Sequence, residues 1–249
     1  RVEGAVGDGG VAVQIGVEHG IHQAILKRDT ASSWAPRIIA PMIDLWLVRH
    51  GETDWNLQRR HQGHLDIPLN ANGCAQALAA ARGLRGHRFS TVYSSDLKRT
   101  RETARVIGGE LGLPVQDLAG LRERHYGLLQ GLTPDEVQRL APDVYRAYKQ
   151  RDLDHDLAGG ETLRGFNQRI LDTIHNLTWQ HSGQSVLLVT HGGVLDLIHR
   201  RCLQSDLTAP RNFPIPNAAF NWIEVNGPYW RLIEWAQQDH LLTTLDEVA

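Results

Sequence analysis

The chain has 249 residues, 41% of them hydrophobic and 22% charged, which is typical of a soluble globular protein with a substantial core. Its formal net charge of -2 gives no reason to expect nucleic acid or an anionic membrane surface as a partner. No apolar run reaches the roughly 18 residues of a membrane span, and the two cysteines, Cys74 and Cys202, offer no disulfide framework and favour a cytoplasmic location.

The first 41 residues differ in character from the rest. The single methionine of the chain, Met42, stands directly before the first clear strand pattern. Residues 1–41 carry four basic and four acidic side chains, so they add no net charge, and they lack the pattern of a secretory signal. We expect residues 1–41 to be a non-native or weakly ordered extension, with Met42 as the native start, and residues 42–249 to form the folded domain.

From Met42 onward, short apolar runs alternate with longer amphipathic segments, as in α/β proteins. The first apolar run predicts a strand at 43–48, and a polar, irregular segment follows it as far as Leu69. The elements predicted next are a helix from a cap at Asn70 or Asn72 to Leu84, a strand at 91–94, and a helix from Ser95 or Asp96 to about Leu111.

The second half of the chain continues this alternation. Thr133, Pro134 and Glu136 have the spacing of a capping box with proline at the first helical position, and they predict the start of a helix. The elements predicted after it are a helix at 162–180, a strand at 186–189, a helix at 193–202, and a hairpin of outer strands at 218–225 and 229–235. Hydrophobic outer strands of this kind are compatible with a homodimer.

Two of the predicted strands end in a histidine followed by glycine. The strands at 43–48 and 186–189 are nearly continuous apolar runs, which is typical of parallel strands buried on both faces. His50 follows the first strand and His191 the second. Because ligands bind outside the carboxyl ends of parallel strands, the two histidines predict one composite site.

The residues near these strand ends have the chemistry that a phosphate monoester requires. Arg49 and Arg99 can each give bidentate hydrogen bonds to phosphoryl oxygens. His50 can act as a nucleophile if a carbonyl holds one ring nitrogen and leaves the other free, and a protonated His191 would stabilise the developing charge. Glu123, in a loop next to glycine, is the best candidate for the proton donor.

Each of these residues also has a plainer interpretation. The two histidines could be structural, Arg99 could pair with Glu102 on an exposed helix face, and Glu123 could anchor a loop through a salt bridge. A metal site is a further alternative, because His61 and His64 lie beside Asp66. Their spacing matches no metal-site signature, however, and favours a solvated polar loop, so we predict no metal.

Taken together, the motifs resemble those of the histidine phosphatase superfamily, in the branch that contains cofactor-dependent phosphoglycerate mutases and small-molecule phosphatases. The resemblance covers most of 42–241. The motifs that carry it, in the expected order, are Leu47 to Asn56, Gln62-Gly63-His64-Leu65-Asp66 with Pro68-Leu69, Ser94 to Thr100, Glu123 to Gly131, Gly159-Gly160-Glu161-Thr162, and Val189 to Gly193. The resemblance implies a phosphoglycerate mutase-like fold, a three-layer sandwich with a mostly parallel central sheet and helices on both faces.

The resemblance also implies a role for each matched residue. His50 is implied to be the phosphorylated nucleophile and Glu123 the proton donor and acceptor. Arg49, Arg99 and His191 are implied to form the phosphate pocket. The positions implied to line the substrate site are Gly51, Asn56, Gln62, Gly63, Tyr126 and Gly192. This mechanism needs neither a metal nor another cofactor, and the implied substrate is a small phosphorylated metabolite.

Two enzymatic functions fit this resemblance, and a silent binding protein on the same fold is the third hypothesis. Mutases of this branch carry a lysine soon after the Glu123 motif and then an insertion with paired arginines. This chain has Thr133-Pro134-Asp135-Glu136 there and a shorter following segment, which favours a phosphatase over a 2,3-bisphosphoglycerate-dependent mutase. Lys149 and Arg151 are among the residues that could restore charge. The complete set of five catalytic candidates disfavours a silent protein.

Overall fold

The computed structural model describes residues 42–242, so the predicted extension at 1–41 lies outside the described residues. Six strands form one mixed sheet in the order β3-β2-β4-β1-β5-β6. The first four strands in this order are mutually parallel, and β5 and β6 extend the sheet in antiparallel fashion beside β1. The strands are β1 (Met42–Arg49), β2 (Thr91–Ser94), β3 (Val115–Asp117), β4 (Ser185–Thr190), β5 (Phe220–Asn226) and β6 (Tyr229–Gln237).

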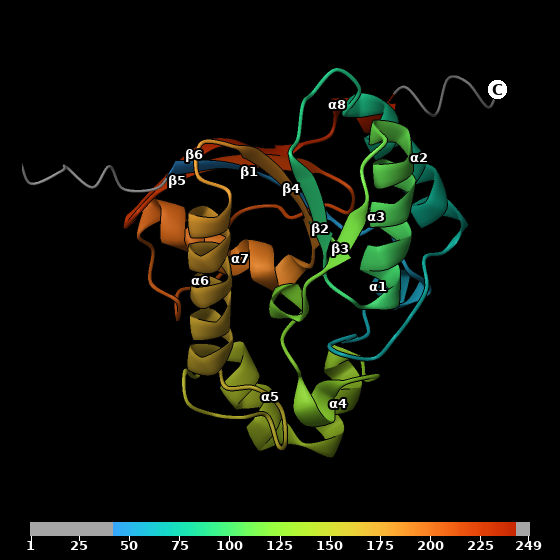
Figure 1. Cartoon of the computed structure of the whole chain (residues 1–249). Coiled ribbons are helices and arrows are strands. Elements are labelled where there is room, and N and C mark those ends of the chain that lie inside the picture. The colour runs from blue at the N-terminus through green and yellow to red at the C-terminus, as the bar shows by residue number, and fades with distance from the viewer. Residues whose placement is uncertain (1–41, 243–249) are drawn as a thin grey trace, which may run out of the picture. The chain divides into compact units, whose positions relative to one another are not determined.

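Helices cover both faces of this sheet, which confirms the predicted three-layer α/β fold (Figure 1). Helices α6 and α7 pack on one face, and α2 and α3 pack on the other. The helices are α1 (Asp54–Leu57), α2 (Ala71–Gly83), α3 (Lys98–Leu111), α4 (Pro134–Leu140), α5 (Pro142–Lys149), α6 (Leu163–Gln180), α7 (Gly192–Leu203) and α8 (Asp239–Leu242). None of these helices is both long and apolar enough to cross a membrane.

The alternation of side chains along the central strands explains the two cores. In β1, Leu45 and Leu47 join the core beneath α6 and α7, whereas Val48 joins the core beneath α2 and α3. In β4, Leu188 faces the first core and Leu187 the second. Successive side chains of a strand point to opposite faces, so a strand with helices on both sides must be apolar throughout.

Most predicted element boundaries are confirmed by their caps. The side chain of Asn70 accepts from the backbone N–H of Gly73 at the start of α2, and Thr162 caps α6 in the same way. The capping box at Thr133 and Glu136 is present at the start of α4. The outer hairpin is also present, with Gly227 at a positive φ of 56° in its turn.

The predicted start of the helix after β2 was wrong. Helix α3 begins at Lys98, and neither Ser95 nor Asp96 caps it. The hydroxyl of Ser95 instead lies 2.8 Å from Nε2 of His191, and the carboxylate of Asp96 receives two hydrogen bonds from Arg122. Both side chains are therefore used in contacts with residues distant in the sequence, which a local capping pattern does not show.

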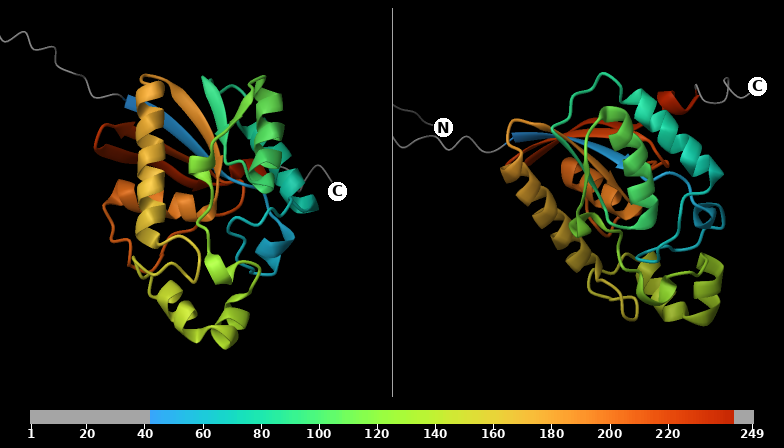
Figure 2. Two further views of the ribbon diagram at one scale, coloured as in Figure 1. Left: turned by 60° about the horizontal axis from the view of Figure 1, so that its bottom comes forward. Right: turned by 45° about the vertical axis from the view of Figure 1, so that its right-hand side comes forward.

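Three short elements among the described residues were not predicted, one of them an edge strand of the sheet. Strand β3 and helices α1 and α8 have three or four residues each. Helices α4 and α5 pack together around a third, small core of Leu129, Val137 and Leu157. Figures 1 and 2 show this pair of helices together beside the loops that follow the strands.

Candidate active site

Two cavities that share three residues lie where the central strands end. The smaller has a volume of about 130 Å³ and the larger about 470 Å³. The shared residues are Arg49, Glu123 and Tyr126. We call them the small and the large cavity. The small cavity is lined by Arg49, His50, Asn56, Arg60, His61, Gln62, Gly63, Arg99, Glu123 and Tyr126.

His50 follows β1 directly and lies at the small cavity, almost completely buried. Its Nδ1 lies 2.7 Å from the carbonyl oxygen of Gly51. Since a carbonyl can only accept, Nδ1 carries the proton and Nε2 keeps its lone pair. Burial, together with the charges of Arg99 and Arg49, lowers the pKa of His50 well below its ordinary value. The ring is therefore neutral near pH 7, as a nucleophile must be.

His191 follows β4 and is fully buried, with its ring centroid 5.4 Å from that of His50. Its Nε2 contacts the hydroxyl of Ser95, which in turn accepts from the backbone N–H of Leu97. When this hydroxyl donates to Nε2, Nδ1 is the protonated nitrogen. Burial and the charge of Arg99 lower the pKa of His191 well below its ordinary value. The protonated His191 considered from the sequence is thus disfavoured in the free protein, but the neutral ring still has one N–H to donate.

The two predicted arginines bring positive charge to the same cavity. Arg99 is 1% exposed, and its two terminal nitrogens donate to the carbonyls of Leu65 and Gly63. An exposed pair between Arg99 and Glu102 is therefore excluded. Arg49 donates through Nη1 to the carbonyl of Ile215. Burial lowers the pKa of Arg99 to about 10, so it remains charged near neutral pH.

Three buried donors at this place have no protein partner. They are Nε of Arg49, Nε of Arg99 and Nδ1 of His191, each without a hydrogen bond among residues 42–242. A buried donor without an acceptor is costly, and clusters of such donors are satisfied by an anion or by water. Two fixed positive charges beside them favour an anion with several oxygens, such as a phosphoryl group.

Glu123 lies at the junction of the two cavities, held by backbone groups. One carboxylate oxygen accepts from the N–H of Arg124 at 2.8 Å, and the other accepts from the N–H of Gly193 at 2.9 Å. Gly193 belongs to the first turn of α7, so the start of this helix faces the carboxylate. A Cβ atom at position 193 would lie 2.1 Å from the Glu123 carboxylate. A side chain at position 193 would therefore displace the Glu123 carboxylate from this place.

The remaining predicted site residues take different places. Asn56, Gln62, Gly63 and Tyr126 line the small cavity, and Tyr126 also lines the large one. Gly192 lines the large cavity but not the small one. Gly51 and His191 lie beside His50 but line neither of the two cavities. The N–H of Gly51 donates to the hydroxyl of Thr103, and its carbonyl accepts from His50.

The large cavity combines residues named from the sequence with residues that were not. Lys149, on α5, and Arg151, just after it, were named as residues that could restore charge, and both line this cavity. The residues that were not singled out are Tyr148 from α5, Asp196 from α7 and Arg211 from the segment before β5. The side chains of Lys149 and Arg211 form no ion pair or hydrogen bond in the part of the chain that the structure describes. No motif connects these residues, because they come from separate elements, and only the fold brings them together.

His61 and His64 are not freely solvated, contrary to the prediction from the sequence. His61 packs against the rings of Tyr126 and Tyr148, and burial lowers its pKa to about 4. His64 donates through Nε2 to the backbone carbonyl of Glu123. Among residues 42–242, no group of three or more His, Cys, Asp or Glu side chains is arranged to hold a metal ion.

Comparison with known proteins connects this geometry to a family. The sequence model described as "Histidine phosphatase superfamily (branch 1)" matches residues 45–238. The chain is 38% identical over 205 residues to "Phosphoglycerate mutase-like protein 4" of Arabidopsis thaliana, covering 81% of this chain and 88% of the relative. It is 36% identical over 209 residues to "Metal-independent phosphoserine phosphatase" of the same plant, covering 82% and 86%.

A solved structure gives the same result. The chain superimposes on Bacillus stearothermophilus YhfR with a TM-score of 0.75 at 30% sequence identity. The match covers 80% of this chain and 99% of that one. Sequence and fold therefore point to one family over nearly all of the described residues.

Proposed function

The chain belongs to branch 1 of the histidine phosphatase superfamily and is a phosphatase of that superfamily; we propose that it hydrolyses small phosphomonoesters through a phosphohistidine at His50. The observation that carries this proposal is the arrangement in the small cavity. A neutral histidine with a free Nε2 lies beside two arginines and a carboxylate. Three buried donors without a protein partner surround the same place.

The proposed reaction has two steps. In the first, Nε2 of His50 attacks phosphorus, the bond from phosphorus to the ester oxygen breaks, and Glu123 gives its proton to the departing oxygen. In the second, Glu123 takes a proton from water, the water oxygen attacks phosphorus, and the bond from phosphorus to nitrogen breaks. Arg49, Arg99 and the N–H of His191 stabilise the phosphoryl oxygens in both steps. The mechanism uses no metal.

The large cavity supports a finer proposal about the substrate. Its volume of about 470 Å³ is suited to a small metabolite. Lys149 and Arg211 offer two cations that no described carboxylate neutralises. We therefore propose that the organic part of the substrate carries a second anionic group, such as a carboxylate, which these two side chains bind. The relative named as a phosphoserine phosphatase is consistent with a substrate of this size and charge.

Phosphate release with EDTA present tests the proposed activity. The wild-type protein should hydrolyse p-nitrophenyl phosphate, and His50→Ala should reduce kcat by at least about a thousandfold, because no other group can form the covalent intermediate. Persistent activity of this variant, or loss of wild-type activity in EDTA, would contradict the mechanism.

A double variant that removes both cations tests whether Lys149 and Arg211 bind a second anionic group of the substrate. Lys149→Gln combined with Arg211→Gln should raise KM for phosphorylated carboxylic acids by about tenfold, as expected for the loss of roughly 1.4 kcal/mol of binding. The same change should leave KM for an uncharged alkyl phosphate within about twofold. Arg146→Gln is the matched control, because Arg146 lies on the same helix but pairs with Asp143 at the surface. Equal effects on both substrates would contradict the assignment.

The mutase alternative is disfavoured by the segment after the Glu123 motif. This segment forms the capped start of α4, where Glu136 binds Arg60, and it contributes no lysine to either cavity. A mutase would interconvert 2- and 3-phosphoglycerate faster than it releases phosphate when 2,3-bisphosphoglycerate is present. We expect phosphate release to dominate under these conditions.

We further propose a cytoplasmic location and a homodimer. Cys74 and Cys202 are both free thiols, which fits a reducing compartment. Strand β6 forms one edge of the sheet and exposes 78% of Tyr229, and an edge of this kind can pair with a second copy. Sedimentation analysis of the purified protein would give the oligomeric state.

A further inference from the structure

The loop that carries Glu123 lacks regular secondary structure around its most important residue. It runs from Gly120 to His125, starting within a short 3₁₀ turn at Ala119–Leu121 and ending before a second one at Gly127–Leu129. We call residues 120–125 the acid loop. Its backbone groups cannot bond within a helix or a sheet, so side chains from elsewhere must satisfy them. The side chain that donates to most of these backbone carbonyls comes from α6.

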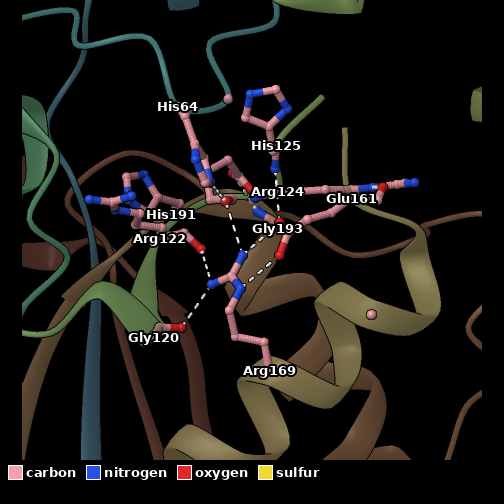
Figure 3. Close-up of polar contacts among 12 residues, drawn as sticks. His64, Gly120, Arg122, Arg124, His125, Glu161, Arg169, His191 and Gly193 are labelled. Atoms are coloured by element: carbon pink, nitrogen blue, oxygen red, sulfur yellow. Dashed lines mark hydrogen bonds and ion pairs between the residues drawn. The ribbon is translucent and has the colours of Figure 1, made fainter. Parts of the chain in front are cut away.

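Arg169, on α6, donates to three carbonyls of the acid loop (Figure 3). Its Nη1 donates to Gly120 at 2.9 Å and to Arg122 at 3.0 Å. Its Nη2 donates to the carbonyl of Glu123 itself at 3.2 Å. One rigid guanidinium thus fixes the backbone at Glu123 and at two positions before it.

Glu161 completes the arrangement from the other side. Its carboxylate accepts from Nε and Nη2 of Arg169 at 2.8 and 2.7 Å and from the backbone N–H of His125 at 3.0 Å. All five N–H groups of Arg169 are therefore used. Burial alone would raise the pKa of Glu161, but the hydrogen bonds from Arg169 and His125 outweigh it and keep the pKa below its usual value. Glu161 therefore stays ionised at neutral pH.

From this geometry we infer that Arg169, fixed by its ion pair with Glu161, is a positioning residue that holds the proton donor Glu123 in place. The inference rests on the proposed function, because it assigns Arg169 a role only through Glu123. Neither Arg169 nor Glu161 lines the small or the large cavity, so we assign neither a contact with the substrate. Their effect must pass through the acid loop, whose backbone they hold on both sides of residue 123.

The physical consequence of losing Arg169 is specific. Without the guanidinium, the carbonyls of Gly120 and Arg122 and the Glu161 carboxylate lose a charged donor, and the Glu123 carbonyl keeps only its contact with His64. The backbone on the amino-terminal side of Glu123 is then free to shift toward water or other partners. A displacement of about 1 Å at a catalytic group can cost about a hundredfold in rate. The nucleophile His50 follows β1, and the arginines lie at the end of β1 and on α3. The loss should therefore affect protonation of the leaving group and not the attack.

Two substrates with different leaving groups distinguish a loss of leaving-group protonation from a loss of nucleophilic attack. Arg169→Gln should lower kcat/KM for an alkyl phosphate by about a hundredfold, the scale of general acid catalysis. For p-nitrophenyl phosphate, whose leaving group needs little protonation, the loss should stay below about threefold. We choose kcat/KM because it reports the steps up to the first phosphoryl transfer. Glu123→Gln should show the same selective loss.

The double variant Arg169→Gln/Glu123→Gln gives the sharpest comparison. If Arg169 acts through Glu123, the double variant should be no slower with the alkyl phosphate than Glu123→Gln alone. Arg164→Gln is the matched control, because Arg164 lies on the same helix and forms an equally bidentate but exposed pair with Asp154. This control should leave both substrates within about twofold.

Two results would overturn the inference. The first is an equal loss with both substrates in Arg169→Gln, and the second is a further loss when the variant is added to Glu123→Gln. If Arg169→Gln does not fold, Arg169→Lys, which keeps the charge next to Glu161, carries the same comparison. Wild-type protein that hydrolyses neither substrate would instead contradict the proposed function, so the two failures are distinguishable.

Discussion

At the scale of single residues, the geometry around Gly193 makes a sharp prediction. Gly193→Ala should lower kcat/KM for alkyl phosphates by about a hundredfold, because its methyl group would displace the Glu123 carboxylate by an ångström or more. Thermal stability should stay within about 1 kcal/mol of wild type, because alanine is a better helix former than glycine. Gly109→Ala, where a Cβ meets nothing within 4 Å, is the control for helix propensity. Unchanged activity of Gly193→Ala would show that catalysis does not depend on the position of the Glu123 carboxylate beside Gly193.

The protonation of His50 is a second prediction at this scale. Burial and the charges of Arg99 and Arg49 lower the pKa of His50, so removing one of these charges should raise it. In a histidine NMR titration, the wild-type ring should remain neutral well below pH 6.5, and Arg99→Gln should move its pKa upward. Arg101→Gln, on the same helix but paired with Asp117 at the surface, should have no effect. A wild-type ring that titrates near 6.5 would contradict a neutral nucleophile held by burial.

The candidate site was predictable from sequence where a motif joins neighbouring residues, and not where the fold joins distant ones. His50 follows a strand directly, so the strand pattern was enough to place it at the carboxyl end of the sheet. Arg169 lies in the middle of an amphipathic helix, where arginine is an ordinary surface residue. Its role depends on carbonyls about 46 to 49 residues away, which no local pattern encodes. Arg211, in a loop without a motif, is missed for the same reason.

At the scale of elements, the cap of α4 can be tested separately from the chemistry. Thr133→Ala should lower the free energy of unfolding by about 1 kcal/mol, since the hydroxyl of Thr133 accepts from the N–H of Glu136. Thr133→Ser should keep most of this stability. Denaturant unfolding measures both variants, and kcat/KM should remain close to wild type. Equal losses in the two variants would mean that the capping bond contributes nothing.

Helices and strands were predicted correctly where the sequence has both an apolar repeat and a residue that ends the element. The long helices and the central strands have both a repeating apolar pattern and a cap or a glycine at their ends, as at Asn70 and Thr162. Strand β3 and helix α1 are too short for any periodicity. Strand β3 forms by pairing with β2, whereas α1 is a single turn closed by the capping box of Thr53 and Asn56. The start of α3 was misplaced because Ser95 serves His191 instead of the helix. In that case a contact with a distant residue took precedence over a local preference.

At the scale of the whole molecule, the buried histidines make stability depend on pH. The pKa values of His50 and His191 lie well below their ordinary value in the folded protein, and that of His61 is about 4. Below about pH 6.5 the unfolded chain binds protons at these rings while the folded protein does not, so stability falls as the pH drops. Each such ring contributes a slope of up to about 1.4 kcal/mol per pH unit.

Chemical unfolding at several pH values checks this dependence. The free energy of unfolding should be constant from about pH 8 to 7 and should decrease steadily from about pH 6.5 toward pH 5. A flat profile across that lower range would mean that the rings are protonated in the folded protein as readily as in the unfolded chain. Such a result would remove the basis for a neutral His50 and His191.

The covalent intermediate is the central claim, and it can be observed directly. Wild-type protein mixed with an excess of substrate and quenched in base within milliseconds should carry one phosphoryl group on the peptide that contains His50. The label should be stable to base, labile to acid and absent from His50→Ala, as expected for phosphate bound to a ring nitrogen. Turnover without any label on His50, or a label on His191 or on a serine instead, would contradict the account.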